Sequence, residues 1–487
     1  MKRMPWIALA AVAGIGSALV AQDPKTSLEA IASAMGSANL RTIEYSGSGS
    51  NFALGQSPNP TAPWPRFNVT SYTASIDYDA PAMRQEIVRT QGENPPRGGG
   101  GQPLAGEQRQ IQVAKGGFAW NLAGANATPA PAALNERILQ FWVTPHGFVK
   151  GALRRNATIK SQTRGGVKTT LVSFAAPDPQ NWRFQGTVNS QNLVEKVETW
   201  IDNPVLGDML VETTYSEYKD FGGVKFPTKI VQKQGGAPTL ELTITEVHPN
   251  APVTIEVPAN VSQATPAPVR VESQKIAEGV WYLTGGSHHS VLVEFKDHVA
   301  VIEGPQNEER SLAVIGEVKK LVPSKPIKYL VNTHQHFDHA GGMRTYAAEG
   351  ATIVTHQIYK PYYEKIFANP RTLNPDRLAQ ARKKAKVEAV VGQKVLFDSD
   401  RELALHPVQG NTHNDGILMA YLPKEKILIE ADVFTPPAPN APPPATPNPF
   451  SVNLYENIQR LKLDVKQIAP LHGRLVTMDD LRKAIGK

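Results

Sequence analysis

The 487-residue chain contains no cysteine. Disulfides, thiolate ligands for zinc, a cysteine nucleophile and a lipidated N-terminal cysteine are therefore all excluded. Aromatic residues make up 7% of the chain and charged residues 20%, and no long run of lysine and arginine occurs. The net charge of +7 is small for this length, so we expect no nucleic-acid partner.

Long hydrophobic runs are also missing, apart from one near the N-terminus. Lys2 and Arg3 precede the apolar run PWIALAAVAGIGSALVA, which gives way to the polar QDPKTS. This order is typical of a secretory signal peptide, and we expect residues 1–21 to be cleaved off after Ala21. An uncleaved anchor helix is the alternative, but the run is short for a membrane span. We therefore expect a periplasmic or secreted protein with no stable membrane span after cleavage.

The remaining chain divides at a stretch rich in proline and alanine, PANVSQATPAPVR. We assign residues 258–270 to this linker, residues 22–257 to an N-terminal domain and residues 271–487 to a C-terminal domain. A chain of 487 residues is too long for one ordinary core, which agrees with this division.

Alternating apolar and polar residues dominate the N-terminal domain. The segment SLEAIASAMG first places Leu28, Ile31 and Met35 at helical spacing. After it, MLVETTYSEY and TLELTITEV show the period of half-buried strands, with glycine turns such as FGGVKFP between strands. We predict an antiparallel, curved β-sheet with an N-terminal helix. The stretch YKDFGGVKFPTKI resembles the curved sheets of LolA-like periplasmic carriers, which implies a concave face that holds an acyl chain or another hydrophobic ligand. A scaffold or a dimerisation element is the alternative role for this sheet.

Strands and helices alternate in the C-terminal domain. HSVLVEF, VAVIEGP and PIKYLVNTH are predicted strands, and NEERSLAVIGEVKKLV and GGMRTYAAEG are predicted helices. This alternation predicts a layered α/β domain. The proline-dense segment from Phe434 to Phe450 can be neither helix nor sheet interior. We expect it to form an exposed loop that shapes substrate access.

Metal-ligand residues are concentrated in NTHQHFDHAGG, which follows the predicted strand PIKYLV. The segment places His334, His336, Asp338 and His339 within six positions. In extended chain, His334 and His336 project to the same side and can reach one ion. The turn that follows can bring Asp338 and His339 to a second ion. Imidazole and carboxylate without thiolate suit Zn²⁺, with iron or manganese as alternatives.

HQHFDH resembles the HxHxDH signature of the metallo-β-lactamase superfamily. GNTHNDG, ILIEADVF and APLHGR resemble the later motifs of the family, in the same order. The resemblance covers about residues 271–487 and implies an αββα sandwich with two zinc ions per chain at one edge. It implies that the first zinc is held by His334, His336 and His413, the second by Asp338, His339 and His472, and that Asp432 bridges both.

The same resemblance implies a hydrolase that acts on a small-molecule substrate. A hydroxide held between the metals would be the nucleophile, and Asp338 would orient it. The bridging aspartate resembles the esterase, lactonase and thioester-hydrolase branches. A β-lactamase of the cysteine-free subclass stays open as an alternative, as does a periplasmic lipid-binding protein with an ancillary metal domain. Di-iron flavoproteins of the superfamily typically have glutamate where this chain has His336, which disfavours a redox role.

Three further side chains are candidates for substrate binding. His288 and His289 lie in GGSHHSVL, a loop that is near the metals in this fold, and Arg474 lies two residues after His472. Glu303 stands where relatives often have aspartate, and we expect it to support the ligands. The sequence leaves both the substrate and the oligomeric state open.

Overall fold

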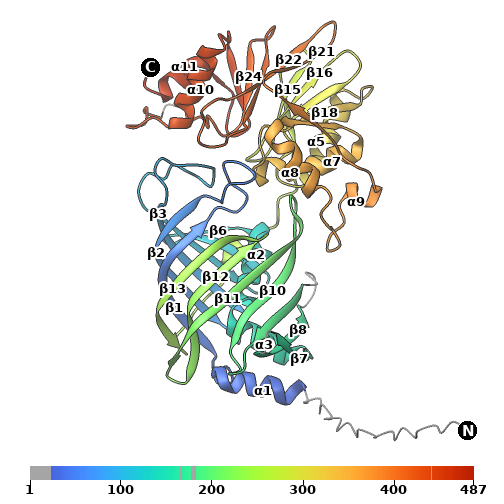
Figure 1. Cartoon of the computed structure of the whole chain (residues 1–487). Helices are drawn as coiled ribbons and strands as arrows, with labels where there is room; N and C mark the ends of the chain where they lie inside the picture. The colour runs from blue at the N-terminus through green and yellow to red at the C-terminus, as the bar shows by residue number, and fades with distance from the viewer. Residues whose placement is uncertain (1–23, 165–166, 177–181, 440) are drawn as a thin grey trace, which may run out of the picture.

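The structure, a computed structural model, describes residues 24–164, 167–176, 182–439 and 441–487. The expected signal peptide lies outside these described residues. The N-terminal part is one 13-stranded antiparallel sheet, and the C-terminal part contains two smaller sheets with helices on their outer faces (Figure 1). None of the described helices is long and apolar enough to cross a membrane.

The large sheet has the strand order β6-β5-β4-β3-β2-β1-β13-β12-β11-β10-β9-β8-β7. Most neighbours in space are therefore neighbours in sequence, as in a series of hairpins. Its strands are β1 (Thr42–Phe52), β2 (Arg66–Asp77), β3 (Ala82–Gln91), β4 (Gln108–Lys115), β5 (Phe118–Ala123), β6 (Asn126–Pro129), β7 (Thr158–Arg164), β8 (Val167–Ala175), β9 (Arg183–Val188), β10 (Val194–Asn203), β11 (Gly207–Phe221), β12 (Val224–Gln234) and β13 (Ala237–Pro249). Its helices are α1 (Pro24–Met35), η1 (Pro131–Ala133), α2 (Leu134–Trp142) and α3 (Pro145–Arg154).

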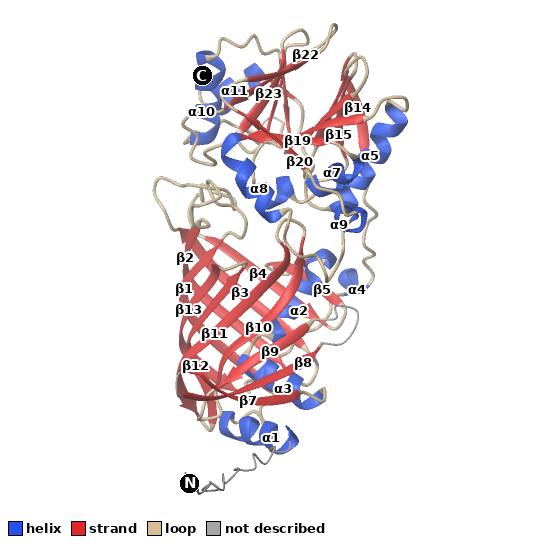
Figure 2. Cartoon of the chain, turned by 45° about the vertical axis from the view of Figure 1, so that its right-hand side comes forward, coloured by secondary structure: helices blue, strands red, loops and turns tan. Residues whose placement is uncertain are grey.

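The curved sheet wraps around a core that the sequence pattern predicts well. Met209, Val211, Thr213 and Tyr215 of β11 are buried, while the residues between them are less buried, which confirms the predicted strand. The initial helix is confirmed as α1. Helices α2 and α3 lie inside the curve of the sheet, and α1 lies across one end (Figure 2).

The concave face of this sheet is filled by side chains. Phe141, Trp142 and Phe148 from α2 and α3 pack there in one cluster with the strands. A cavity of about 30 Å³ remains between Tyr45 and Tyr215, which is room for little more than a water molecule. The implied acyl-chain site does not fit into this cavity.

Two sheets face each other in the C-terminal part. The first has the order β14-β15-β16-β17-β18-β19-β20 and the second the order β21-β22-β23-β24-β25-β26. The first contains β14 (Glu272–Ala277), β15 (Val280–Thr284), β16 (Ser290–Glu294), β17 (Val299–Ile302), β18 (Ile327–Val331), β19 (Thr352–His356) and β20 (Lys386–Val390). The second contains β21 (Lys394–Phe397), β22 (Glu402–Pro407), β23 (Leu418–Leu422), β24 (Ile427–Glu430), β25 (Gln467–Pro470) and β26 (Val476–Thr477).

Three apolar layers hold this part together. One lies between the two sheets, one between the first sheet and its helices, and one between the second sheet and its helices. This is the expected αββα sandwich. The helices are α5 (Glu308–Leu321), α6 (Phe337–Ala340), α7 (Met343–Glu349), η2 (Gln357–Tyr359), α8 (Lys360–Ile366), α9 (Arg377–Ala381), α10 (Pro449–Arg460) and α11 (Met478–Ala484).

The segment between the two parts is not uniformly extended. It contains the short helix α4 (Ala259–Ser262) inside the stretch that we assigned to the linker. Val261 of this helix is buried in a cluster with Trp120 of β5, and Asn260 donates from its side chain to the carbonyl of Ala127 at 2.7 Å. The beginning of the segment is therefore attached to the large sheet.

The hairpin between β10 and β11 docks the large sheet onto the C-terminal part. Val205 at its tip is buried in the apolar layer beside the first sheet of that part. The Arg371 guanidinium donates to the carbonyls of Pro204 at 2.7 Å and Val205 at 3.1 Å. Buried apolar contact and these hydrogen bonds together fix how the two parts lie.

Candidate metal centre

The metal-ligand segment NTHQHFDHAGG leaves the buried strand β18 at the edge of the sandwich. His334 and His336 lie in the extended stretch after the strand, and the short helix α6 carries Asp338 and His339. The side chains of His334, His336 and His339 are fully buried, whereas Asp338 is 34% exposed. The local sequence thus places four donors at one strand end, as predicted.

Three more predicted ligands reach the same edge from distant parts of the chain. His413 lies in the loop between β22 and β23, Asp432 follows β24, and His472 follows β25. Asp432 adopts the left-handed backbone conformation with φ of 65°. This conformation is costly for a residue with a Cβ and persists where the surroundings hold it.

A first group of three imidazoles faces one oxygen of Asp432. The distances to Asp432 Oδ2 are 3.5 Å from His334 Nε2, 3.9 Å from His336 Nδ1 and 3.0 Å from His413 Nε2. These three nitrogens form no hydrogen bond with any described residue. Buried polar atoms normally have partners, so nitrogens that share one direction and lack partners fit a metal ion.

A second group faces the other oxygen of Asp432. Asp432 Oδ1 lies 3.1 Å from His339 Nε2 and 2.8 Å from His472 Nε2. Asp338 Oδ2 lies 3.7 Å from the same nitrogen of His339. The Asp432 carboxylate is therefore turned toward both groups, in the arrangement that the family resemblance implies.

The charge environment of these histidines suits a cation. Burial lowers the pKa of His334 and of His336, which keeps both imidazoles in the neutral form that binds metal. At His339 burial also opposes the charged form, but the carboxylates of Asp432 and Asp338 outweigh it and raise the pKa well above its usual value. The negative charge that holds this proton would equally attract a divalent ion.

Glu303 forms hydrogen bonds with residues of the metal-ligand segment. Its fully buried carboxylate accepts hydrogen bonds from His339 Nδ1 and from Asn332 Nδ2, both at 3.1 Å, and from the hydroxyl of Thr333. The bond from Nδ1 leaves Nε2 of His339 directed toward Asp432, as carboxylate–histidine pairs do at metal sites. The expected supporting role of Glu303 agrees with these contacts.

The glycine pair after the segment packs closely against neighbouring segments. The φ values of Gly341 and Gly342, −64° and −98°, suit any residue, so the backbone conformation does not require glycine there. A Cβ at Gly341 would lie 1.8 Å from the carbonyl oxygen of Gln306, and one at Gly342 would lie 1.9 Å from Ser311 Oγ. Close packing is therefore what requires glycine here.

A cavity of about 620 Å³ opens beside both ligand groups. The loop from Phe434 to Phe450 contributes much of its wall, in agreement with the role that we expected for it. Gln56, Gly100, Gly101 and Gln102 of the N-terminal part form another wall. Sequence reasoning missed this second wall, although the glycine-rich stretch GENPPRGGGGQP was a signal for a loop that can approach other backbone closely.

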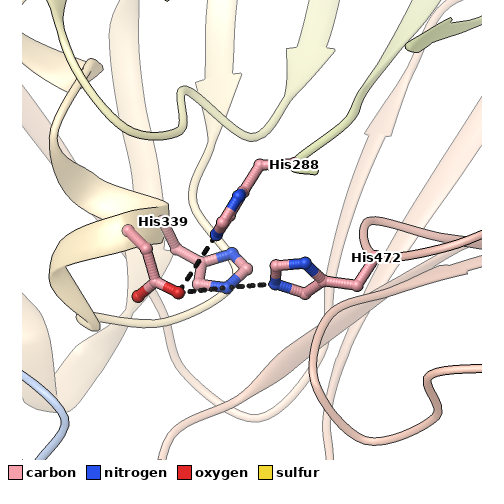
Figure 3. A group of neighbouring side chains, drawn as sticks. His288, His339 and His472 are labelled. Atoms are coloured by element: carbon pink, nitrogen blue, oxygen red, sulfur yellow. Dashed lines mark hydrogen bonds and ion pairs between the residues drawn. The ribbon is translucent and has the colours of Figure 1, made fainter. Parts of the chain in front are cut away.

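Of the three candidates for substrate binding, His288 lies closest to the ligands. Its Nε2 is 3.1 Å from Asp338 Oδ2, and its ring centroid is 4.2 Å from that of His472. His288, His339 and His472 converge from three separate segments (Figure 3). His288 thus belongs to the second ligand group by position.

The other two candidates have partners elsewhere. His289 Nε2 lies 2.8 Å from the carbonyl oxygen of Gly473, and burial lowers the pKa of this imidazole to about 4. Arg474 lies 3.4 Å from Asp480 Oδ1. Neither side chain is among those that line the cavity.

Comparison with known proteins agrees with the topology. Residues 283–470 match the family model of the Metallo-beta-lactamase superfamily. The C-terminal half of this chain has a metallo-β-lactamase fold. The family match covers every motif that we identified except His472, which lies two residues beyond it.

Individual relatives match part of this chain at low identity. The 2,4-dinitroanisole O-demethylase subunit alpha of Nocardioides sp. (strain JS1661) is 24% identical over 170 residues, which are 34% of this chain and 47% of that protein. This chain thus spans about half the length of that relative. The metallo-beta-lactamase from Pontibacter korlensis is 19% identical, with 45% of this chain and 98% of that chain covered and a TM-score of 0.34. The rubredoxin oxygen:oxidoreductase from Desulfovibrio gigas is 17% identical, with 44% of this chain and 61% of that chain covered and a TM-score of 0.35.

Proposed function

We propose that this chain is a zinc-dependent hydrolase with two ions in the metallo-β-lactamase-fold domain. The observation that carries the proposal is the carboxylate of Asp432, whose two oxygens face two separate groups of imidazole nitrogens beside a cavity of about 620 Å³. Two divalent ions in such a site supply a nucleophilic hydroxide near neutral pH and polarise the electrophile. The absence of cysteine agrees with a nucleophile that is not a thiol.

The side chains have separate roles in this proposal. The first ion would be held by His334, His336 and His413, the second by Asp338, His339 and His472, and Asp432 would contact both. Asp338 borders the cavity, so its carboxylate can orient the attacking water and accept its proton. Glu303 keeps Nε2 of His339 directed inward.

We propose an ester, lactone or thioester as the bond that is hydrolysed. The cavity has the size of a small-molecule site. A second candidate is an aryl ether, since the relative is named for O-demethylation of 2,4-dinitroanisole. A β-lactam amide is the third candidate bond, because the fold also suits the cysteine-free β-lactamases.

Metal analysis of the purified chain tests the foundation of this proposal. We expect about two transition-metal ions per chain, zinc rather than iron or manganese, and far less metal in a His334→Ala/His336→Ala double variant. His248→Ala is the matched control, because His248 is an exposed histidine of the large sheet. A wild-type chain that binds no metal would refute the enzyme proposal.

A substrate panel then assigns the bond. Lactones, aryl esters, thioesters, 2,4-dinitroanisole, phosphodiesters and β-lactams would be offered to the metal-loaded chain. We expect turnover of an ester, lactone or thioester that disappears in the double variant. Turnover of the β-lactam nitrocefin with inert esters and lactones would reassign the chain to the β-lactamases.

The proposed location is the periplasm or the extracellular space, and it follows from the apolar N-terminal run. Detection of the chain in a periplasmic or secreted fraction would support it, and retention in the cytoplasm would refute it. A carrier role for the large sheet predicts lipid that co-purifies with the chain. The filled concave face argues against this role.

A further inference from the structure

Two loops of the large sheet reach the metal centre. Residues 53–65 connect β1 to β2, and residues 92–107 connect β3 to β4. Both loops lie at the end of the sheet that faces the C-terminal part (Figure 1). Their contacts with the predicted ligands give the N-terminal part a role in the site.

The first loop holds one predicted ligand through a backbone carbonyl. Ser57 O lies 2.9 Å from His336 Nε2. A carbonyl oxygen accepts hydrogen bonds and cannot donate, so Nε2 carries the hydrogen. His336 Nδ1 is then the nitrogen with a free lone pair, and it is this nitrogen that faces Asp432 at 3.9 Å. A partner of this kind fixes the tautomer and ring orientation of a metal ligand.

The same loop holds a second predicted ligand through a side chain. Gln56 Nε2 donates to Asp338 Oδ1 at 2.7 Å, which leaves Oδ2 of that carboxylate toward His339. The other loop holds the glutamine in turn, since the backbone N–H of Gly100 donates to Gln56 Oε1 at 3.1 Å. Both loops therefore cooperate in orienting one carboxylate.

Glycines let the two loops approach this closely. A Cβ at Gly99 would lie 2.0 Å from Gln56 Oε1 and 3.0 Å from His336 Cε1. A Cβ at Gly55 would lie 2.2 Å from the ring of Phe337, which stands between two predicted ligands in the sequence. Larger residues at these positions would push the loops away from the ligands.

Further hydrogen bonds anchor the loops beside His413. The backbone N–H of Gly98 donates to Thr412 O at 2.9 Å, and the backbone N–H of Asp415 donates to Pro58 O at 2.8 Å. Asn59 Nδ2 also donates to the Asp415 carboxylate at 2.7 Å. Bonds between two backbones do not depend on side-chain rotamers, so they hold the loops in a defined place.

We propose that the N-terminal domain is part of the active site. In this proposal, which rests on the proposed hydrolase function, its loops position His336 and Asp338 and form the wall of the substrate cavity that selects substrates by size. Gln56 is a positioning residue that acts through Asp338. Gly100 and Gly101 are wall positions of the cavity.

Two variants test the positioning role without a substrate. Gln56→Leu removes the donor to Asp338, and Gly99→Ala displaces the carboxamide without removing it. We expect each variant to lower the affinity for the second metal ion about tenfold, as measured by competition with a chelator. This is the lower end of the range for residues that support metal ligands. Gln191→Leu, an exposed glutamine in the turn between β9 and β10, is the matched control.

Two glycines of the second loop test the cavity wall. Gly101 and Gly106 have similar φ values of 85° and 89°, and a Cβ at either meets no atom within 4 Å, but Gly101 alone of the two lines the cavity. Both alanine variants therefore carry the same backbone strain. We expect Gly101→Ala to raise KM several-fold for the bulkiest accepted substrate, and Gly106→Ala to leave KM unchanged.

The outcomes separate this inference from the proposed function. A wild-type chain without metal overturns both. The positioning role is overturned if the wild-type chain binds two ions and neither Gln56→Leu nor Gly99→Ala changes the affinity for the second ion. Equal KM values in the Gly101→Ala and Gly106→Ala variants overturn the size-selecting wall.

A separate observation concerns His288. Its Nδ1 lies 2.9 Å from Ser287 Oγ, while its Nε2 points to Asp338 Oδ2. Donor atoms of His288, Asp338, His339 and His472 all lie within 4.8 Å of one another. We infer that His288 is an additional ligand of the second ion, beyond the set that the family resemblance implies.

The neighbouring histidine provides the control for this inference. His289 Nε2 is already bonded to the carbonyl of Gly473, and His289 is not a member of the group. We expect His288→Ala to lower the affinity for the second ion by about 100-fold or more in a titration of the metal-free chain with Co²⁺, beyond the effect of residues that only support ligands. We expect His289→Ala to leave this affinity unchanged. Unchanged affinity in His288→Ala with a raised KM would overturn the ligand role in favour of a substrate contact.

Discussion

Two fully buried histidines, one in each part of this chain, differ in how their ring nitrogens are used. In the large sheet, His146 is fully buried and both of its ring nitrogens have partners: Nδ1 lies 2.7 Å from Ser37 Oγ and Nε2 lies 3.1 Å from Lys225 O. In the metallo-β-lactamase-fold domain, His336 is equally buried, but only its Nε2 has a hydrogen-bond partner among the described residues. Burial alone therefore does not identify a ligand.

The difference lies in where the second nitrogen points. His146 satisfies both nitrogens within the core, and this avoids the cost of about 1–3 kcal/mol for an unpaired buried polar atom. His336 uses Nε2 for orientation and leaves Nδ1 toward Asp432, which His334 and His413 also face. This distinction can be tested at both places.

The largest expected effect is the loss of the shared carboxylate. Asp432→Ala removes the oxygens that face both ligand groups and leaves their imidazoles without a common anion. We expect both ions to be lost and kcat/KM to fall by about 1,000-fold or more, beyond the 10–100-fold effects of supporting residues. Metal analysis and steady-state kinetics measure these changes. A variant that keeps two ions would contradict the bridging role.

The next effect concerns the core histidine. Burial lowers the pKa of His146 to about 3 from its usual 6.5. The unfolded chain therefore binds a proton that the folded chain does not, and stability is complete above about pH 6.5 and is lost as the pH falls toward 3. Linkage gives a loss of about 2 kcal/mol between pH 7.5 and pH 5 from this group.

Urea unfolding at several pH values measures this loss. His146→Gln, which cannot take up the proton, should flatten the pH dependence of the large sheet by that amount, whatever its own stability at pH 7.5. His248→Gln is the control, since His248 is exposed. An unchanged slope in the His146 variant would show that other groups cause the acid sensitivity.

The smallest expected effect concerns Glu303, whose carboxylate accepts a hydrogen bond from the predicted ligand His339. Glu303→Gln keeps the shape of the side chain but removes the charge that His339 Nδ1 faces at 3.1 Å. We expect the affinity for the second ion to fall about tenfold while the fold is retained. Competition with a chelator measures this affinity. Glu309→Gln is the control variant, because Glu309 is an exposed glutamate on α5. Equal affinities would mean that the carboxylate has a structural role alone.

Much of this architecture was predictable because it depends on local spacing. The period of two in MLVETTYSEY determined which face of β11 is buried, and the helical spacing of Leu28, Ile31 and Met35 determined α1. His334 and His336 were predictable as a pair for the same reason. The distant donors His413, Asp432 and His472 were identified by the resemblance of their motifs.

Other features depend on which distant segments meet. No local pattern indicates that residues 53–65 contact the metallo-β-lactamase-fold domain, because that contact depends on how the β10–β11 hairpin docks at Arg371. The filled interior of the large sheet depends on the packing of α2 and α3, and His288 joins the second group through the path of its loop.

The types of secondary structure and the donor pair His334 and His336 follow from residue type and short-range spacing, so the sequence alone predicts them. The distant donors came from the resemblance of their motifs to the family. The orientation of each donor and its surroundings depend instead on how distant segments pack together. Ser57 and Gln56 illustrate the reason: each lies about 280 positions from the ligand that it holds, as the separations of 279 and 282 residues show. Such contacts form when two folded parts dock, and only their packing together determines them.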